Sequence, residues 1–343
     1  MTRPRQPRQD AAMSILPPLS ILDLAPVVDG DTTRQALLNS LDLVKLADGL
    51  RYQRYWVAEH HNMEGVASSA TAVLIGQLAA ASTRIRVGAG GIMLPNHAPL
   101  TIAEQFGTLA ELFPGRIDLG LGRAPGTDRP TMRALRRSLE STGEDGFPND
   151  VLELQSYLGP AAADAPVRAV PGQGTAVPIW LLGSSLYGAQ LAAYLGLPFA
   201  FASHFAPEML MQALQIYRST YRPSERHPRP HAAVGLNVIV APTDEEARHL
   251  FTSVQQRFLG MVRGWRGKLP PPVASMDALW TPAEQMQVER MLSESLVGSP
   301  DTVRAGLRAT AERTGADEFI VACAVHSHAL RRRSYVLLDE LIG

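Results

Sequence analysis

Short apolar runs alternate along the chain with segments whose apolar residues recur every three or four positions. This alternation is typical of βαβ units on a parallel sheet. The runs of strand length lie at residues 19–24, 54–58, 85–89, 116–120, 179–182, 199–202, 231–240 and 318–322. Eight such runs, each followed by a helical segment, predict a (β/α)8 TIM barrel, which takes about 250 residues and more with insertions.

Two stretches are too long to be ordinary connections between a strand and a helix. Residues 124–177 follow the fourth strand and residues 241–299 follow the seventh, and we expect them to be insertions that shape a pocket and a lid. The alternative is an open doubly wound sheet in two halves. The absence of a linker and of an internal repeat favours one barrel domain over residues 15–343, after a flexible tail at 1–14.

Composition does not change the predicted fold, but it argues against several classes of protein. A hydrophobic fraction of 45% in 343 residues is enough for a sizeable core. A formal net charge of -1, with no basic cluster beyond residues 331–333, argues against nucleic-acid binding. The chain has no run of 18 apolar residues, so no membrane span is predicted. Cys323 is the single cysteine, which excludes an internal disulfide and makes a reducing, cytoplasmic setting the default.

Polar residues and glycines gather where the predicted strands end, and that end of a barrel carries the active site. They are Glu59, His60, His61 and Asn62 after the second strand, Gly90, Gly91, Asn96 and His97 after the third, Arg123 after the fourth, Gly183, Ser184, Ser185 and Gly188 after the fifth, His204 after the sixth, and His326 and His328 after the eighth. If the second strand continues, His60 and His61 point to opposite faces and only one reaches the barrel axis. That histidine is a candidate for proton transfer, and the alternative is a buried ring bonded to Glu59 or to the backbone.

Arg123 and the turn formed by Gly183, Ser184 and Ser185 are a candidate anion site. Glycine and serine at a helix start free backbone N–H groups, and the helix dipole favours a phosphate there. An arginine from the neighbouring strand can hold two phosphate oxygens. The alternative is simple capping of the helix by a serine, with Arg123 in a structural ion pair.

Three further features each allow two interpretations. Gly90 and Gly91 at a strand end form either a bulge or a backbone that a flat ligand approaches closely. His326 and His328 are more typical of a polar strand end than of a metal pair, so no metal site is expected. The apolar face of the helix at residues 69–82 either packs within the chain or forms a dimer seam, and it comprises Ala70, Val73, Leu74, Gln77, Ala80 and Ala81.

Taken together, these motifs resemble those of the bacterial luciferase-like flavin monooxygenases. The resemblance rests on residues 55–62, 85–95, 113–123, 178–185 and 196–198, and it covers nearly the whole chain after Leu19. Residues 22–27 and the second-strand motif are similar to the single-subunit branch of the family. Gly122 stands where luciferase itself has a reactive cysteine, which argues against light emission.

The resemblance implies a barrel that binds FMN at its carboxyl rim. Reduced FMN would come from a separate NAD(P)H:flavin reductase, and the enzyme would use O2 to oxygenate a small organic substrate. His60 matches the family's catalytic histidine, and a cis peptide bond can join Gly90 to Gly91 beneath the flavin. The residues expected around the cofactor are Glu59, Gly90, Gly91, Arg123, Gly183, Ser184, Ser185 and Gly188. The resemblance also implies a homodimer built through the helices after the second and third strands.

Two other functions remain open on the sequence. One is an oxidoreductase of the same fold that uses the deazaflavin F420 for hydride transfer without oxygen. The other is a barrel that binds flavin without catalysis, although His60 and Arg123 are both present. Cofactor spectra separate the first alternative from the FMN enzyme, and oxygen uptake with reduced FMN separates the second.

Overall fold

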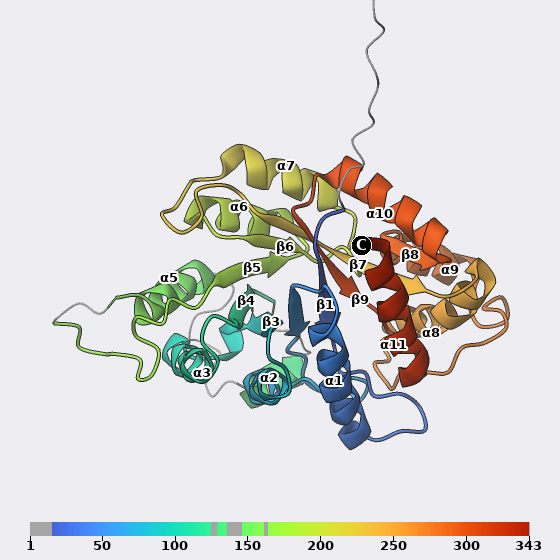
Figure 1. The fold of residues 1–343 in the computed structure, drawn as a ribbon, viewed down its shortest axis with the longest axis horizontal. Coiled ribbons are helices and arrows are strands. Elements are labelled where there is room, and N and C mark those ends of the chain that lie inside the picture. The colour runs from blue at the N-terminus through green and yellow to red at the C-terminus, as the bar shows by residue number, and fades with distance from the viewer. Residues whose placement is uncertain (1–15, 125–128, 136–145, 161–163, 343) are drawn as a thin grey trace, which may run out of the picture.

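The computed structural model of the protein describes residues 16–124, 129–135, 146–160 and 164–342. Its strands form a closed, eight-stranded parallel barrel, β1 to β7 in sequence order followed by β9, which pairs again with β1 (Figure 1). The strands are β1 (Leu19–Asp23), β2 (Arg54–Val57), β3 (Arg86–Met93), β4 (Ile117–Gly122), β5 (Ile179–Gly183), β6 (Phe199–Phe201), β7 (Ala232–Val240), β8 (Ser295–Gly298) and β9 (Glu318–Ala322). The predicted barrel and all eight predicted strands are confirmed.

One further strand, β8, is not predicted from the sequence pattern. It pairs with the carboxyl half of β7, beyond the point where β6 has ended. Three of its four residues are only half-buried, so no apolar run marks the strand in the sequence.

Helices surround the barrel and also build its two insertions. Those on the barrel are α1 (Thr33–Asp48), α2 (Thr71–Ala80), α3 (Pro99–Leu112), α6 (Leu186–Leu195), α7 (Leu210–Thr220), α10 (Pro300–Thr314) and α11 (His328–Asp339). The insertions hold α4 (Arg129–Leu135), α5 (Phe147–Leu158), α8 (Asp244–Val262) and α9 (Pro282–Met291). Short 3-10 turns occupy Leu94–Asn96 and Glu340–Ile342. Thr32 caps α1 through a hydrogen bond from the Gln35 N–H, as its sequence position predicts.

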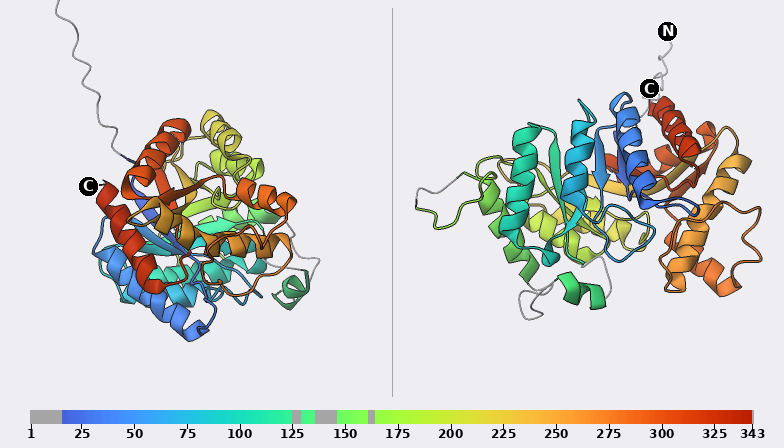
Figure 2. Two further views of the ribbon diagram at one scale, coloured as in Figure 1. Left: turned by 90° about the vertical axis from the view of Figure 1, so that its right-hand side faces the viewer. Right: turned by 90° about the horizontal axis from the view of Figure 1, so that it is seen from below.

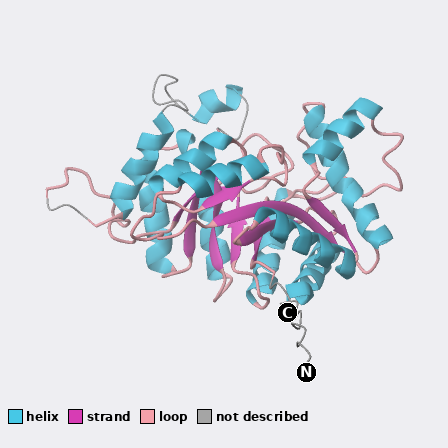
Figure 3. Cartoon of the chain, turned by 90° about the horizontal axis from the view of Figure 1, so that it is seen from above, coloured by secondary structure: helices cyan, strands magenta, loops and turns pink. Residues whose placement is uncertain are grey.

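Parts of both predicted insertions lie at the same end of the barrel, whereas α5 of the first insertion packs beside α3 on the outside. In Figure 2, right, and in Figure 3, α4 and the α8–α9 pair are on one side of the molecule, and the two chain ends are on the other. Each insertion leaves from the carboxyl end of its strand, so this side is the carboxyl rim. The predicted tail at 1–14, and parts of the first insertion, lie outside the described residues.

Side chains alternate between two apolar regions, as the pleat of a strand requires. The larger region fills the space between the barrel and its helices. The smaller one lies inside the barrel and comprises Leu22, Trp56, Ala58, Trp180, Ala200, Ala233 and Ile320. Trp56 and Trp180 meet edge to face, with ring centroids 5.2 Å apart. The barrel is therefore a packed core, and its centre is closed to ligands.

A charged layer lies below the tryptophans, at the amino end of the barrel. Arg54 donates to Asp118 at 2.7 Å and to Glu318 at 3.0 Å, and its guanidinium lies 4.8 Å from the centre of the Trp180 ring. Burial alone would raise the pKa of Glu318, but the hydrogen bond from His231 and the charge of Arg54 outweigh it, so the pKa is lowered. Glu318 is therefore ionised, and both acids are paired with Arg54.

Cys323 lies directly after β9 and is buried, as expected for a small core residue. Burial raises the pKa of its thiol.

The expected apolar face of α2 is only partly correct. Val73 is 72% exposed, and Ala70, Gln77 and Ala80 are exposed with it, whereas Leu74 packs into the core. Among the described residues, no helix is both long and apolar enough to cross a membrane.

Candidate active site

Glu59 is the centre of the hydrogen bonding at the carboxyl rim. Its buried carboxylate accepts hydrogen bonds from His61 at 2.7 Å, His97 at 3.0 Å and Asn96 at 3.2 Å, and from the Met93 N–H at 2.9 Å. Its own N–H donates to the Gly91 carbonyl oxygen at 3.0 Å. One side chain thus ties the end of β2 to the end of β3 and to the 3-10 turn after it.

These hydrogen bonds keep Glu59 ionised. Burial alone would raise the pKa of its carboxyl, but the hydrogen bonds from His97, His61 and the Met93 N–H outweigh burial, and the pKa lies below its usual value. Because its oxygens already accept four donors of the protein, the geometry fits a residue that positions the loop more than one that moves protons.

The two histidines after β2 make different contacts. Strand β2 ends at Val57, and the His61 ring bonds to the Glu59 carboxylate. A ring bonded to Glu59 is the structural alternative to a proton-transfer role given above. Burial, and after it the electrostatic interaction with His60, lowers the pKa of His204, so His60 lies within electrostatic range of the loop after β6. The His60 backbone is held by Ser69, whose hydroxyl donates to its carbonyl oxygen at 2.6 Å.

His204 is held as a neutral ring. The residue is half-buried, and its Nδ1 has neither solvent contact nor a hydrogen-bond partner among the described residues. Burial, then the charges of His60 and Arg257, lowers its pKa to about 4. The sequence analysis placed His204 at the rim but gave it no role.

Gly90 and Gly91 are both required by their surroundings. The peptide bond between them is cis, as the resemblance implied, and the pairing of β3 with β4 shifts register there, which confirms the predicted bulge. A Cβ on Gly90 would lie 2.9 Å from Trp56, and one on Gly91 would lie 2.7 Å from the Gly120 carbonyl oxygen. Neither position accepts a side chain without rearrangement of the barrel end.

Arg123 lies beside the start of α6, as the candidate anion site requires. Its guanidinium is 4.1 Å from the centre of the Tyr187 ring, and Tyr187 belongs to the first turn of that helix. Ser185 is the N-cap residue, but its side chain makes no capping hydrogen bond. The serine capping that formed part of the alternative interpretation is therefore not observed at Ser185. Arg123 and the first turn of α6 are both half-buried, and the N-terminal N–H groups of a helix favour an anion.

The glycines of this turn are not explained by the protein's own packing. A Cβ on Gly183 or Gly188 would make only ordinary contacts, at 3.7 Å and 3.5 Å. The residues from 182 to 188 are half-buried. The turn is thus a shallow cradle that side chains would fill, and a phosphate group fits the chemistry of its donors.

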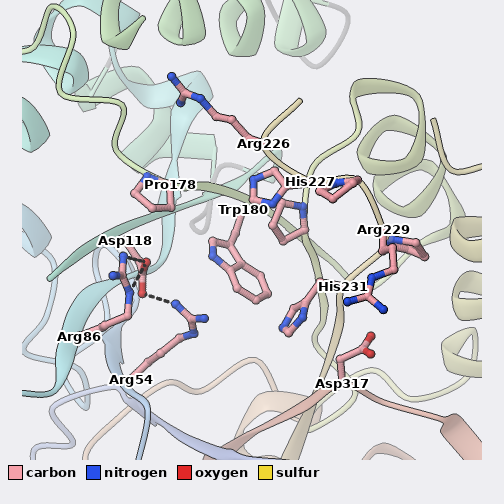
Figure 4. A pocket seen from close by; sticks show the side chains of 13 residues that line it. Arg54, Arg86, Asp118, Pro178, Trp180, Arg226, His227, Arg229, His231 and Asp317 are labelled. Carbon is pink, nitrogen blue, oxygen red and sulfur yellow. Dashed lines mark hydrogen bonds and ion pairs between the residues drawn. The ribbon is translucent and has the colours of Figure 1, made fainter. Parts of the chain in front are cut away.

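A cavity of about 660 Å³ opens at the opposite, amino end of the barrel (Figure 4). Its wall includes the ion-paired Arg54, Arg86 and Asp118, and Arg226 and Arg229 lie at its margin. Asp118 already pairs with both Arg54 and Arg86. We therefore interpret these charged residues as closing the amino end of the barrel structurally.

His326 and His328 have separate partners. His328 contacts Asp42 at 2.7 Å, whereas His326 contacts the Asp29 carbonyl oxygen at 3.2 Å. Within the part of the chain that the structure describes, no group of three or more His, Cys, Asp or Glu side chains is arranged to hold a metal ion.

The chain belongs to the luciferase-like monooxygenase family, whose model matches residues 19–318. A luciferase-like monooxygenase of Escherichia coli (strain K12) is 55% identical over 328 residues, which are 94% of this chain and 98% of that protein. The crystal structure of apo-MsnO8 is 37% identical with a TM-score of 0.88, and it covers 95% of this chain and 98% of its own. The N-acetyl-S-alkylcysteine monooxygenase of Bacillus subtilis (strain 168) is 29% identical over 94% of this chain and 98% of its own.

The lowered pKa of His204 predicts a pH dependence of stability. Between pH 6.5 and about 4 the unfolded chain binds the proton while the folded chain does not. The contribution of the neutral ring is therefore complete above pH 6.5 and is lost as the pH falls toward 4. Relative to His204→Gln, the wild type should lose at most about 1.4 kcal/mol of unfolding free energy per pH unit in this window. Urea unfolding of both chains measures this, and parallel pH curves would show that the ring titrates normally.

Proposed function

We propose that this protein is an FMN-dependent monooxygenase that takes reduced FMN from a separate NAD(P)H:flavin reductase. It uses O2 to oxygenate a small organic substrate. Membership of the luciferase-like monooxygenase family supports oxygenation. The observation that carries a phosphate-bearing flavin is the stacking of Arg123 on Tyr187 beside the start of α6, where Ser185 makes no capping hydrogen bond.

The residues of the rim fit such a cofactor. Arg123 and the backbone N–H groups at Ser184 and Ser185 would hold the phosphate, in the cradle that Gly183 and Gly188 leave open. The ring system would lie against Gly90 and Gly91, where the barrel accepts no side chain. Glu59 would keep this loop in place from below.

Reduced FMN, when bound, supplies the activation of O2. The protein's part is to hold or move a proton at a ring nitrogen of His60, beside the reacting group. The neutral His204 supports this role, because a second cation next to His60 would disfavour its protonation. The two insertions at the rim would exclude water from the bound substrate.

The relative from Bacillus subtilis, by its name, oxygenates N-acetyl-S-alkylcysteines. Alkyl thioethers are therefore the first substrate class to test with this chain. The class suits the proposed chemistry, because a thioether sulfur accepts an oxygen atom readily.

We also propose that the protein is a homodimer through the exposed side of α2. Val73 and Leu112, at 72% and 66% exposure, are large apolar side chains on the adjacent helices α2 and α3. Exposed apolar patches of this kind mark interfaces, and a symmetric pair would use the same patch twice.

Removal of the Arg123 guanidinium tests the phosphate site. Arg123→Ala should weaken FMN binding about ten- to a hundredfold, because a charge-assisted contact is lost, and should leave riboflavin binding almost unchanged. Arg222→Ala is the matched control, since Arg222 stacks on Tyr194 at the same 4.1 Å near the other end of α6. Fluorescence titration measures both flavins. An equal loss for FMN and riboflavin would contradict the assignment, and tight binding of F420 alone would replace FMN as the cofactor.

Removal of the His60 ring tests the catalytic role. His60→Ala should retain FMN binding but lose about 10²–10⁴-fold in oxygenation of an accepted thioether, while hydrogen peroxide release continues or rises. The control is His249→Ala, on the exposed side of α8. Oxygen uptake, peroxide and product are measured together with a flavin reductase present. Unchanged coupling of oxygen to product in His60→Ala would exclude this role.

A charge on the exposed side of α2 tests the dimer. Val73→Glu should shift the sedimentation coefficient from dimer to monomer, because it places two carboxylates in a symmetric apolar contact. Met286→Glu changes an equally exposed apolar residue on α9 and should leave assembly unchanged. A wild-type chain that sediments as a monomer at micromolar concentration would refute the dimer directly.

A further inference from the structure

The helix α8 carries an arginine on its buried side. Leu250, Ser253 and Val254 precede Arg257 by seven, four and three residues, so the four side chains share one face of the helix. The first three are buried, and Arg257 itself is half-buried. By contrast, Arg248 on the same helix is exposed to solvent.

No acidic partner compensates Arg257 among the residues that the structure describes. Other inward arginines have one, since Arg331 contacts Asp23 at 2.7 Å and Arg54 contacts Asp118 at 2.7 Å. Even the exposed Arg263, one and a half turns further along α8, donates to Glu284 at 2.7 Å. Burial lowers the pKa of Arg257, whereas the neighbouring acids raise the pKa of Arg331 and of Arg54 against burial. A partly buried, uncompensated charge is costly, and a ligand that supplies the counter-charge would offset this cost.

Further polar atoms near Arg257 lack partners. Ser253, one helical turn earlier on the same face, has a fully buried hydroxyl with no hydrogen-bond partner in the described part of the chain. The same is true of the Nδ1 atom of His204, which lies within the range of the Arg257 charge. His204 is in turn close to His60. The amide nitrogen of Asn237 on β7 donates to the His204 carbonyl oxygen at 2.5 Å, and α8 packs on β7 and β8, so the loop after β6 and α8 both adjoin the same strand at the rim.

We propose that Arg257 binds a carboxylate of the organic substrate and so directs the rest of the substrate toward His60. A guanidinium holds a carboxylate through two parallel hydrogen bonds, which gives both affinity and orientation. The flavin phosphate has its own arginine in the proposed function, because Arg123 follows β4 whereas Arg257 follows β7. The proposal rests on the proposed function only for the identity of the ligand as the substrate.

The test compares an acid with its neutral amide on the full chain in the absence of flavin. The probes are 4-(methylthio)butanoate and 4-(methylthio)butanamide, which differ in charge but hardly in shape. Isothermal titration calorimetry should show the acid binding about ten- to a hundredfold more tightly to the wild type. Arg257→Gln and Arg257→Met should abolish that preference, whereas Arg248→Gln should retain it. Neither Arg257 variant removes a hydrogen bond to another residue that the structure describes, so their melting temperatures should equal or exceed that of the wild type.

Three results would overturn the proposal. The first is equal binding of acid and amide by the wild type, and the second is an equal loss of preference in Arg248→Gln. The third is a loss of FMN affinity without loss of riboflavin affinity in Arg257→Gln, which would assign the arginine to the flavin phosphate instead. A wild-type chain that binds the acid selectively but binds no FMN would refute the proposed function and leave the carboxylate site standing.

Discussion

The hydrogen-bonded seam between β1 and β9 is the constraint on which the rest of the structure depends. It pairs Leu19 with Phe319 and Leu22 with Ala322, and it turns a row of strands into a ring. A buried ion pair lies over this seam. Arg331 of α11 contacts Asp23 of β1 at 2.7 Å, and the same carboxylate accepts the hydroxyls of Ser40 and Tyr55. The last helix is thereby fixed to the first strand, and α1 and α11 lie side by side (Figure 1).

Closure divides the molecule into two ends with different tasks. The tryptophan layer fills the centre, so the amino end, with its paired arginines and acids, does not communicate with the carboxyl rim. At the rim, parallel strands bring His60, Gly91, Arg123 and His204 together although up to 144 residues separate them in the sequence. Rigid strand ends hold the proposed site residues, and the two insertions are free to differ in their loops.

The sequence predicted those features that depend on local pattern. The eight barrel strands are apolar runs and are visible without the fold. The turn that we propose to hold the phosphate is a Gly-Ser-Ser sequence at a helix start, so its position is visible as well. The bonding of Glu59 to His97 and to the Met93 N–H is not visible, because it joins residues 38 and 34 positions apart across a bulge. The different contacts of His60 and His61 depend on the end of strand β2 at Val57. No glycine or proline marks that end in the sequence.

The inward position of Arg257 could not be predicted from the sequence, for a different reason. The region from 241 to 299 is rich in polar residues, and an arginine there is expected to face solvent. Its inward position follows only when Leu250 and Val254 are seen to be buried on the same side of α8. The opposite error concerns α2. Leu74 fits an apolar stripe that the sequence assigns to the outward side of this helix, but it packs inward in the fold.

The central claim is that the carboxyl rim of this barrel binds FMN with its phosphate at the start of α6. A crystal structure of the protein soaked with FMN tests it most directly. The account predicts the phosphate within hydrogen-bond distance of the Arg123 guanidinium and of the backbone N–H groups at Ser184 and Ser185, with the ring system over Gly90 and Gly91 and near His60. A phosphate bound beside Arg257, or in the cavity at the amino end, would contradict it.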